Sequence, residues 1–433
     1  MSALRVLTAC RVNGAWADAA LSAELKRESL GAADAALASR IVYGVLQNRM
    51  LLDRYLSEYC TQRLEHLQQP LPDILRIGAY QILFLDKVPD SAAVNESVEL
   101  AKASKRGAAA GLVNAVLRKL SRSRNRPPAL PEDAVERLSL ETSHPKWLTE
   151  RMLSLRGAAD AEAFLQLNNA VAPIAAQVNP LKTTVESLLR ELADAGVEAE
   201  PHRWVPDCIE LSGAGDLTAL PAFSRGEFIV QDAAARLVSL VAGVRPGIKA
   251  LDVCAAPGGK AFSAAFAMRD EGEVVACDLH ENKLERIRAG VARLGLGCVR
   301  TQAADGRVFR PQWADAFDAV LCDVPCSGLG VIRKKPDIRY KEPEALAVLP
   351  NIQRAILENS ARYVRPGGVL IYSTCTVLPE ENEQVTDDFL AGNGSFSYEA
   401  FDLPIGTAPG HITLWPQTHG TDGFYISKLR RKA

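Results

Sequence analysis

Two short stretches carry residue types that could do chemistry, an acid with a thiol in one and a second thiol in the other. Asp323 and Cys326 lie in VLCDVPCSGLG, residues 320–330, just past an apolar run that is typical of a buried parallel strand. A second apolar run, residues 368–372, is followed by Ser-Thr-Cys-Thr, whose cysteine is Cys375. Because ligands bind at the carboxyl ends of strands in open α/β sheets, we expect the acid and both thiols on one rim of a sheet.

Cysteine is a strong nucleophile only as the thiolate, a small fraction at neutral pH, so a catalytic site has to supply the activation. Cys254, Cys277 and Cys322 fall in predicted strands or at their ends, and we interpret them as small core residues. Cys326 and Cys375 differ because each follows a strand and precedes a loop. The nine cysteines are odd in number and scattered, which favours reduced thiols over a disulfide framework. Their spacing does not match a zinc site, so no metal is expected.

A glycine turn lies between a predicted strand and a predicted helix in LDVCAAPGGK, residues 251–260. Backbone N–H groups and the start of the helix can approach a ligand closely there. The stretch has neither the P-loop nor the dinucleotide pattern, which indicates a nucleotide-like ligand without a long phosphate chain. Three acids end successive strands: Asp278 is placed for ribose hydroxyls, Asp305 for an adenine amino group, and Asp323 belongs to the thiol stretch. Each alone is commonly a capping or surface residue, but together they favour a cofactor site.

A regular alternation of strands and helices after residue 231 has to position these residues. Parallel strands joined by helices predict a Rossmann-like, doubly wound sheet, and residues 411–430 predict a closing hairpin. The predicted strands are Lys249–Cys254, Val274–Asp278, Val299–Ala303, Ala319–Asp323 and Gly368–Ser373. The predicted helices are Gly259–Met268, Glu281–Leu294, Pro343–Val364 and Pro379–Leu390.

The N-terminal part of the chain has apolar residues at helical spacing and predicts an all-α domain over residues 1–130. Residues 1–126 hold 18 Lys or Arg against 12 Asp or Glu, and this sign favours a polyanionic partner. A basic run at the end of one helix is as commonly a solvated surface as an RNA contact, so both interpretations stay open. That run includes Arg118, Lys119 and Arg122. Helical spacing is clearest in Ala36–Leu46, Leu51–Tyr59 and Ile74–Phe84.

A proline-rich linker at residues 127–131 separates this domain from a segment that alternates between helical and extended patterns. We therefore predict a small α/β subdomain over residues 131–230. Its predicted helices are Pro145–Leu155, Ala159–Asn168 and Val185–Ala193, and its extended segments are Ile174–Val178, Cys208–Leu211 and Phe228–Val230. No run reaches the length of a membrane-spanning helix and the N-terminus lacks a signal-peptide layout, so we expect a cytoplasmic protein, with a monomer as the default.

Four of these motifs resemble those of the S-adenosylmethionine-dependent RNA cytosine-5 methyltransferases: GGK in the glycine turn, DVPCSGLG, STC, and the PEEN that follows it. The resemblance extends over the whole chain. Residues 330–340 and 144–148 are similar to segments of the bacterial enzymes that act on 16S ribosomal RNA. It implies a NusB-like helical RNA-binding domain at 1–130, a small α/β RNA-binding subdomain at 131–230 and a methyltransferase domain at 231–433.

The resemblance also implies roles for individual residues. Cys375 attacks C6 of the target cytosine, Cys326 assists release of the methylated product, Asp323 hydrogen-bonds or protonates N3, and Lys260 supports the same site. Binding of S-adenosylmethionine is assigned to Cys254, Ala255, Ala256, Pro257, Gly258, Gly259, Lys260, Asp278, Asp305 and Asp323. The implied partner is 16S ribosomal RNA, free or in an early assembly particle, and its contacts are assigned to Arg118, Lys119, Arg122, Arg333 and Lys334.

The chemistry of these residue types agrees with that assignment. Cytosine C5 is a poor nucleophile until a group adds at C6, so a thiolate adduct helped by an acid at N3 produces an enamine able to attack a methyl sulfonium. The C5 proton then leaves and the thiol is expelled, a step that a second cysteine can assist. Reaching C5 and C6 requires an unstacked base, so a single-stranded or hairpin target is expected.

Three other interpretations stay open. In the first, the thiol roles are exchanged and Cys326 is the nucleophile, as in cytosine-5 methyltransferases that act on DNA. In the second, the chain is an RNA-binding assembly factor with a degenerate catalytic domain, although Lys260, Asp323 and both thiols are intact. An amino-group methyltransferase is the third, and it is disfavoured because that chemistry uses a Pro-aromatic motif without a thiol. Two positions depart from the family: Gln177 stands where an arginine is expected, which puts that RNA contact in doubt, and SGLG has a leucine in place of a small residue, which we interpret as neutral.

Overall fold

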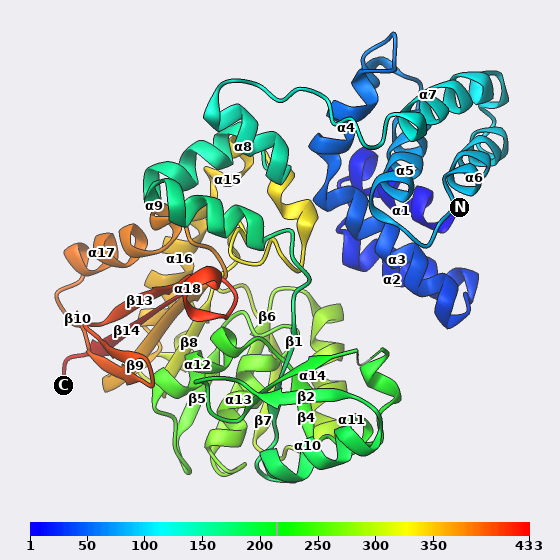
Figure 1. Ribbon diagram of the computed structural model, residues 1–433. Helices are drawn as coiled ribbons and strands as arrows, with labels where there is room; N and C mark the ends of the chain where they lie inside the picture. The colour runs from blue at the N-terminus through cyan, green and yellow to red at the C-terminus, as the bar shows by residue number, and fades with distance from the viewer. Residues whose placement is uncertain (214) are drawn as a thin grey trace. The chain divides into compact units, whose positions relative to one another are not determined.

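The computed structural model describes residues 1–213 and 215–433. Contacts divide the chain into two compact units. The first, called here the helical unit, comprises residues 1–170 with 332–342, and the second, called the sheet unit, comprises residues 171–331 with 343–433 (Figure 1). This grouping is coarser than the three domains expected from the sequence, whose boundaries stay a prediction.

The helical unit is built around α5 (Leu71–Phe84), in which almost every residue is buried. A helix that is covered on all sides has to be apolar all round, as its sequence LPDILRIGAYQILF largely is. Helix α7 (Ala110–Arg122) instead buries one stripe, and its basic residues occupy the other side. The remaining helices are α1 (Ser2–Asn13), α2 (Ala17–Glu28), α3 (Ala32–Gln47), α4 (Arg49–Ser57), α6 (Asp90–Ala103), α8 (Ala134–Thr142) and α9 (Lys146–Leu167), with short 3-10 turns η1 (Leu64–His66) and η2 (Gly107–Ala109).

Two helices were expected where the structure has α9. Gly157 interrupts α9 with φ 74° and ψ 174°, a backbone conformation that glycine adopts at little cost. The interruption falls between the two predicted segments, 145–155 and 159–168. The expectation of two helical pieces is therefore confirmed, although their ends merge.

The returning segment 332–342 packs within the helical unit, where it forms the 3-10 turn η5 (Pro336–Tyr340). Arg339 is fully buried. Its Nη1 donates to the carbonyl of Gln47 at 3.1 Å and to Asn169 Oδ1 at 2.7 Å, and its Nη2 donates to the carbonyl of Asn168 at 3.2 Å. Its Nη1 also donates to the carbonyl of Thr142 at 3.2 Å, so one guanidinium connects three parts of the unit.

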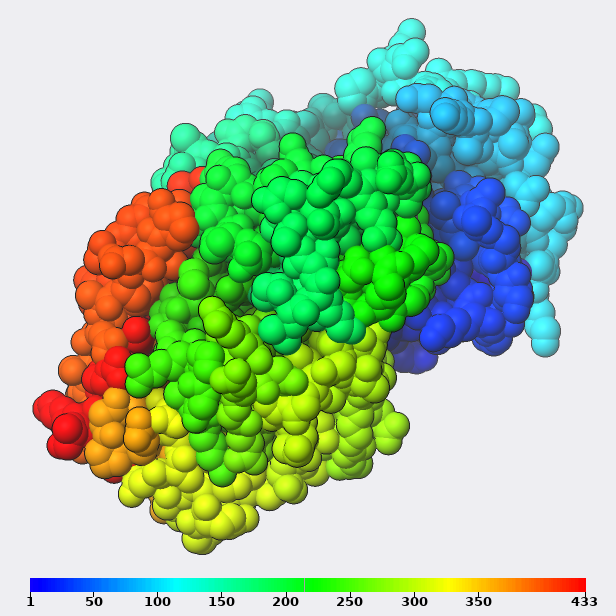
Figure 2. Space-filling model, turned by 90° about the horizontal axis from the view of Figure 1, so that it is seen from below, coloured from blue at the N-terminus to red at the C-terminus, as the bar shows by residue number. Residues whose placement is uncertain are grey.

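The sheet unit contains a small antiparallel sheet of order β2-β3-β1-β4. Figure 2 shows this part of the unit in green. The edge strand β2 was not predicted, because its sequence EAEP lacks an apolar alternation and carries charges and proline, as edge strands commonly do. The elements are β1 (Ile174–Val178), α10 (Val185–Asp194), β2 (Glu198–Pro201), β3 (Cys208–Ser212), η3 (Leu217–Ala219), α11 (Pro221–Ser224) and β4 (Phe228–Val230).

The large sheet of this unit has the order β10-β14-β9-β8-β5-β6-β7, with β13 paired to β14. Strands β5 to β9 are parallel, and β14 is antiparallel to β9. The predicted doubly wound sheet and the closing hairpin are therefore confirmed. The strands are β5 (Lys249–Asp252), β6 (Glu273–Asp278), β7 (Val299–Ala303), β8 (Phe317–Asp323), β9 (Val364–Thr374), β10 (Phe396–Tyr398), β13 (His411–Leu414) and β14 (Phe424–Arg431), with a separate hairpin of β11 (Phe401–Leu403) and β12 (Gly406–Ala408).

Helices cover both faces of this sheet, because successive strand residues point to opposite sides. Ala250 packs in one core with α12 (Ala233–Ala242), α13 (Gly259–Ala267) and α14 (Glu281–Leu294), whereas its neighbour Leu251 packs in the other core with α16 (Leu349–Ala361) and α17 (Glu383–Gly392). Short helices α15 (Pro343–Leu346) and α18 (Pro416–His419) and 3-10 turns η4 (Pro311–Trp313) and η6 (Pro379–Glu381) complete the unit.

The single helix predicted over 343–364 is wrong in extent. It is split into α15 and α16, and Val364 already belongs to β9. Pro350 explains the break because it stands in the first turn of α16, where a missing N–H is tolerated. The helix predicted over 379–390 likewise begins as η6, and α17 starts only at Glu383.

In the described residues no helix is both long and apolar enough to cross a membrane. All nine cysteines are free thiols, as expected from their distribution. The described His, Cys, Asp and Glu side chains form no group of three or more suited to a metal ion.

Candidate active site at the carboxyl ends of the parallel strands

Strands β5, β8 and β9 are neighbours in the sheet, and the order of connection reverses between β5 and β8. Such a switch point opens a crevice at the carboxyl ends of the strands. Strand β8 ends at Asp323 and β9 ends at Thr374, one residue before Cys375. Helix α13, which carries Lys260 at its second position, starts after β5. The topology thus brings the sequence-predicted acid, lysine and thiols to one rim.

Lys260 and Asp323 form an ion pair with 2.7 Å between Nζ and Oδ2. The other carboxylate oxygen, Oδ1, accepts a hydrogen bond from Ser373 Oγ at 2.8 Å. Burial alone would lower the pKa of Lys260, but the carboxylate of Asp323 outweighs it and holds that pKa above its ordinary value. The lysine therefore remains a cation, and its charge is fixed beside the acid.

The sulfur atoms of Cys326 and Cys375 lie 3.3 Å apart. The contact with Cys375 and burial both raise the pKa of the Cys326 thiol well above its ordinary value. Two thiols at this distance do not both ionise readily, because the negative charge of one thiolate disfavours ionisation of the other thiol. Cys326 is consequently the member that keeps its proton, and its S–H can donate to the sulfur of Cys375.

A buried carboxylate holds the loop that carries Cys326. Oε2 of Glu381 accepts the backbone N–H of Ser327 at 2.8 Å and the side-chain amide of Gln353 at 2.8 Å. The same amide nitrogen also donates to the carbonyl of Pro325 at 3.0 Å, and Ser327 Oγ donates to Thr376 Oγ1 at 2.7 Å. Ser327 is thereby tied directly to the segment that follows Cys375, and Pro325 is tied to it through Gln353.

Gly330, the second glycine of the SGLG turn, is required because its backbone passes close to the backbone of Gly423. A Cβ on Gly330 would lie 1.9 Å from the carbonyl oxygen of Gly423, so only glycine fits. The backbone N–H of Gly330 donates to the carbonyl of Cys375 at 3.0 Å, and Gly423 N–H donates to the carbonyl of Gly330 at 2.9 Å. The turn therefore fastens both thiol loops to each other and to the closing hairpin.

The glycine turn expected to hold the cofactor lies between β5 and α13. Gly258 has φ +115°, and a Cβ there would come within 2.4 Å of the Phe262 ring. Its N–H donates to the carbonyl of Ala255 at 2.6 Å, which closes the turn just before the first residue of α13. The turn thus presents the start of a helix to the rim of the sheet.

Two acids follow the next strands, and they differ in what they already bind. Asp278 is the last residue of β6, and its Oδ1 accepts the N–H of His280 at 3.0 Å and lies 3.4 Å from Lys283 Nζ, whereas Oδ2 has no partner in the described residues. Both oxygens of Asp305 are bound by Arg307, which lowers the pKa of that carboxyl. Asp278 thus offers an acceptor to ribose hydroxyls, and a ligand would have to share Asp305 with Arg307.

A fourth acid at a strand end, Asp252, was not among the predicted site residues. Asp252, the last residue of β5, is fully buried, and neither carboxylate oxygen has a hydrogen-bond partner in the described residues. Burial raises its pKa to about 7, with a further rise from Asp323 that Lys260 opposes. Its place inside LDVCAAPGGK was a signal that could have identified it, as PEEN was for Glu381. Gln353 had no motif to mark it.

The residues expected to contact RNA lie on α7 and in the returning segment, and Gln177, which stands where an arginine is expected, lies in β1. Arg118, Lys119 and Arg122 are exposed on α7, opposite its buried stripe. Arg333 and Lys334 belong to the segment that packs within the helical unit, where both are half-buried. Gln177 is buried in β1 and accepts a hydrogen bond from Ser263, so it is a packing residue of the sheet unit.

A parallel sheet with this strand order, a glycine turn after its first strand and acids at the following strand ends defines the class of S-adenosylmethionine-dependent methyltransferases. When bound, S-adenosylmethionine supplies an electrophilic methyl group. The residues fit it, since the turn of 254–260 leaves backbone and a helix start at the rim, and among the described residues Oδ2 of Asp278 has no partner.

Comparison with known proteins gives the family. Residues 243–430 match the family model of the 16S rRNA methyltransferase RsmB/F, residues 1–122 match the NusB family, and residues 144–218 match the ferredoxin-like domain of RsmF/B-like methyltransferases. The probable ribosomal RNA small subunit methyltransferase B of Bacillus subtilis is 34% identical over 99% of this chain and 98% of its own length. The ribosomal RNA small subunit methyltransferase B of Klebsiella pneumoniae is 33% identical over 92% and 90%.

A crystal structure titled PH0851 superposes with a TM-score of 0.84 at 27% identity and covers 99% of this chain and 98% of its own. A methyltransferase homologue from Pyrococcus horikoshii covers 70% of this chain and all of its own with a TM-score of 0.60 at 27% identity. The chain belongs to the ribosomal RNA small subunit methyltransferase B family.

Proposed function

We propose that the protein transfers a methyl group from S-adenosylmethionine to C5 of a cytosine in 16S ribosomal RNA through a covalent adduct between Cys375 and C6 of the base. The relatives named above support the RNA class, because their names assign them to the small ribosomal subunit. The observation that carries the proposal is the 3.3 Å contact of two thiols on the same rim as the Lys260–Asp323 pair.

Cys375 is the proposed nucleophile because Cys326 is the thiol that holds its proton. The sulfur of Cys375 adds to C6 as the thiolate, and the ring takes up a hydrogen bond or proton at N3, which turns C5 into an enamine carbon. Lys260 keeps its positive charge on the same rim, because the carboxylate of Asp323 holds the pKa of the lysine above its ordinary value.

Asp323 is proposed to face N3 and the exocyclic amine of the cytosine. Ser373 and Lys260 hold its two oxygens from opposite sides, so the carboxyl group is oriented before the base arrives. After the methyl group has been transferred, the C5 proton leaves and the C6–S bond breaks. Cys326 is proposed to assist this elimination, because its thiol already lies against the sulfur that has to depart.

The adduct requires access to the face of the base, so the cytosine has to leave its stack. Unstacking costs a few kcal/mol in a duplex and less in a loop, and the target is therefore proposed to be a single-stranded or hairpin cytosine. Contacts to the RNA are proposed for the exposed cations of α7 and for Arg333 and Lys334.

The test compares wild type with Cys375→Ala and Cys326→Ala on 16S RNA and labelled S-adenosylmethionine. The expected results are methyl transfer by wild type, loss of transfer with Cys375→Ala, and a denaturation-resistant protein–RNA complex with Cys326→Ala, since methylation proceeds but release fails. Cys322→Ala, a fully buried thiol of β8, is the matched control.

Two results would contradict the proposal. If the trapped complex is lost with Cys326→Ala and kept with Cys375→Ala, the thiol roles are exchanged. If wild type transfers no methyl group to any RNA cytosine while it still binds RNA, the chain acts as a binding factor.

A further inference from the structure

A cavity of about 430 Å³ lies within the helical unit. Its wall combines α1, the start of α4, α5 and the returning segment 332–342. Four cations line it: Arg11, Arg49, Arg76 and Lys341. A cavity of this size with several convergent charges is the usual form of a small-ligand or nucleotide site.

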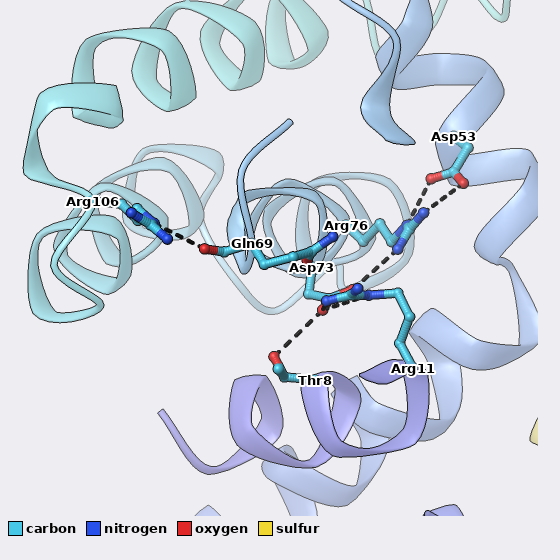
Figure 3. A network of polar contacts seen from close by, with 7 residues as sticks. All are labelled: Thr8, Arg11, Asp53, Gln69, Asp73, Arg76 and Arg106. Carbon is cyan, nitrogen blue, oxygen red and sulfur yellow. Dashed lines mark hydrogen bonds and ion pairs between the residues drawn. The ribbon is translucent and has the colours of Figure 1, made fainter. Parts of the chain in front are cut away.

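Two of these cations are already neutralised by carboxylates. Arg11 and Arg76 converge on Asp73, with Nη2 of Arg11 at 2.7 Å from Oδ2 and Nη1 of Arg76 at 3.0 Å from Oδ1 (Figure 3). Arg76 also binds both oxygens of Asp53 at 2.8 Å, and Thr8 approaches Asp73 from α1. This network is saturated, so it forms a rigid wall and leaves little capacity for a further anion.

Arg49 is different because it lacks an acceptor. Its guanidinium stacks on the ring of Tyr340, with 3.5 Å between Cζ and the ring centroid, and its nitrogens donate no hydrogen bond to any described residue. Burial lowers the pKa of Arg49, with Arg76 contributing to the fall and Tyr340 opposing it. Arg49 is only partly buried and its nitrogens are not enclosed, so the guanidinium keeps its donors available to a ligand oxygen.

An aromatic ring borders the same cavity. Trp16 lies in the loop between α1 and α2 and is 47% exposed, and Lys341 Nζ lies 4.7 Å over its ring. An exposed indole beside an arginine without an acceptor matches the two halves of a nucleotide, because bases stack on aromatic rings and phosphates bind guanidinium groups. The carboxyl of Asp337, also in the wall, adds an acceptor for base amino groups.

We propose that this cavity binds one unpaired nucleotide of the RNA substrate, with its phosphate on Arg49 and its base on Trp16. This inference rests on the proposed function, because the occupant is taken to be the RNA substrate named there. The site requires Tyr340 and Lys341, which belong to the returning segment 332–342. This segment follows the Cys326 loop in sequence, and it thereby contributes to RNA recognition in the helical unit.

The first experiment measures binding of the full chain to 16S RNA at several salt concentrations. Arg49→Gln should weaken binding roughly tenfold and reduce the slope of log K against log salt by about one, since one phosphate contact is lost. Arg49→Lys should recover part of the affinity, because it keeps the charge without the planar fork. The matched control is Arg40→Gln, which removes an exposed cation of α3 that does not line the cavity.

The second experiment locates the ligand directly on wild-type protein. Phenylglyoxal modifies accessible arginines, and mass spectrometry compares the labelling of Arg49 with that of Arg40 in the presence of a single-stranded 16S oligonucleotide or of AMP. Protection of Arg49 by the oligonucleotide alone supports the proposal. Equal protection by AMP at the same nucleotide concentration would assign the cavity to a free nucleotide and overturn the RNA occupant.

The two proposals fail separately. If wild type methylates RNA but Arg49→Gln binds like Arg40→Gln and Arg49 is not protected, the cavity proposal is overturned and the catalytic one stands. If wild type transfers no methyl group, the binding and protection results still decide the cavity. Should Arg49→Gln fold poorly by circular dichroism, Trp16→Ala replaces it, since it removes an exposed side chain and should weaken binding roughly tenfold through lost stacking.

Discussion

The sulfur of Cys326 lies 3.3 Å from the sulfur of Cys375, although the two residues are 49 positions apart in the chain. Parallel pairing of β8 with β9 places the two loops side by side, and Glu381 then fixes the first loop against the second. Contact with Cys375 and burial hold the pKa of the Cys326 thiol well above its ordinary value, so Cys326 keeps its proton.

Replacing Cys375 by Ala should lower the pKa of the Cys326 thiol. Contact with Cys375 is the largest cause of the raised value, and without it burial is the main remaining cause. The pH at which Cys326 reacts with iodoacetamide, followed by mass spectrometry, should therefore move to lower pH in Cys375→Ala. An unchanged pH midpoint would show that the two thiols do not titrate together. Cys277, buried in β6, provides the internal control for general accessibility.

Removing the carboxylate of Glu381 should impair catalysis, because the loop that carries Cys326 would no longer be held in place. Glu381→Ala removes the carboxylate that accepts the N–H of Ser327 and one of the two acceptors of the Gln353 amide nitrogen, which costs about 1–3 kcal/mol. We expect kcat for methyl transfer to fall at least tenfold, whereas Glu381→Gln, which keeps a carbonyl oxygen, should lie in between. Glu358→Ala, on the exposed side of α16, is the control and should behave as wild type. Equal kcat for Glu381→Ala and the control would remove the positioning role.

Most of the parallel sheet could be predicted because β5, β6, β8 and β9 contain short, largely apolar runs, whereas the edge strand β7, VRTQA, alternates. Val299–Ala303 and Glu281–Leu294 have the predicted bounds. Period-two alternation was less informative, since strands buried on both faces are apolar throughout. This explains why the edge strand β2, which is polar, was missed.

The candidate site was predictable where chemistry and motif coincide, as at Lys260, Asp323 and the two thiols. It was not predictable where a residue acts through a fold-dependent contact. Gln353 reaches Glu381 only because α16 packs on the sheet, and the capture of segment 332–342 by the helical unit depends on contacts far apart in sequence. Arg49 is a similar case, because its lack of a hydrogen-bond acceptor among residues 1–213 and 215–433 is visible only in three dimensions.

The buried carboxyl of Asp252 should make the sheet unit less stable as pH rises. Its folded-state pKa is about 7, against an ordinary value of 3.8, so between about pH 4 and pH 7 the folded protein retains a proton that the unfolded chain has released. Unfolding then becomes easier with rising pH, by up to about 4 kcal/mol for a three-unit difference. The side chain of Asp252→Asn does not titrate in this range. Measured without cofactor, the melting temperature of this variant should therefore fall less between pH 5.5 and pH 8 than that of wild type. Parallel pH profiles for the two proteins would contradict the raised pKa.

Arg339 should be the residue that holds the returning segment in the helical unit. It is fully buried, and the acceptors of its guanidinium are carbonyl groups, among them those of Gln47 and Asn168. Arg339→Met would leave several buried carbonyls unpaired and should cost roughly 3 kcal/mol, which hydrogen exchange should register as lost protection of the backbone over residues 332–342. Lys335→Met removes only a half-exposed ion pair with Asp18 and should leave that protection within experimental error.

Arg339→Met also distinguishes the role of the returning segment in RNA binding from the methyl-transfer reaction. Residues 332–342 follow directly after the SGLG turn, so release of the segment should raise the KM for RNA if Arg49 and Tyr340 form a nucleotide site, while the KM for S-adenosylmethionine should stay near the wild-type value. Unchanged exchange over 332–342 in Arg339→Met would show that other contacts, such as the hydroxyl of Tyr340 on the carbonyl of Leu46 at 2.7 Å, suffice to hold the segment.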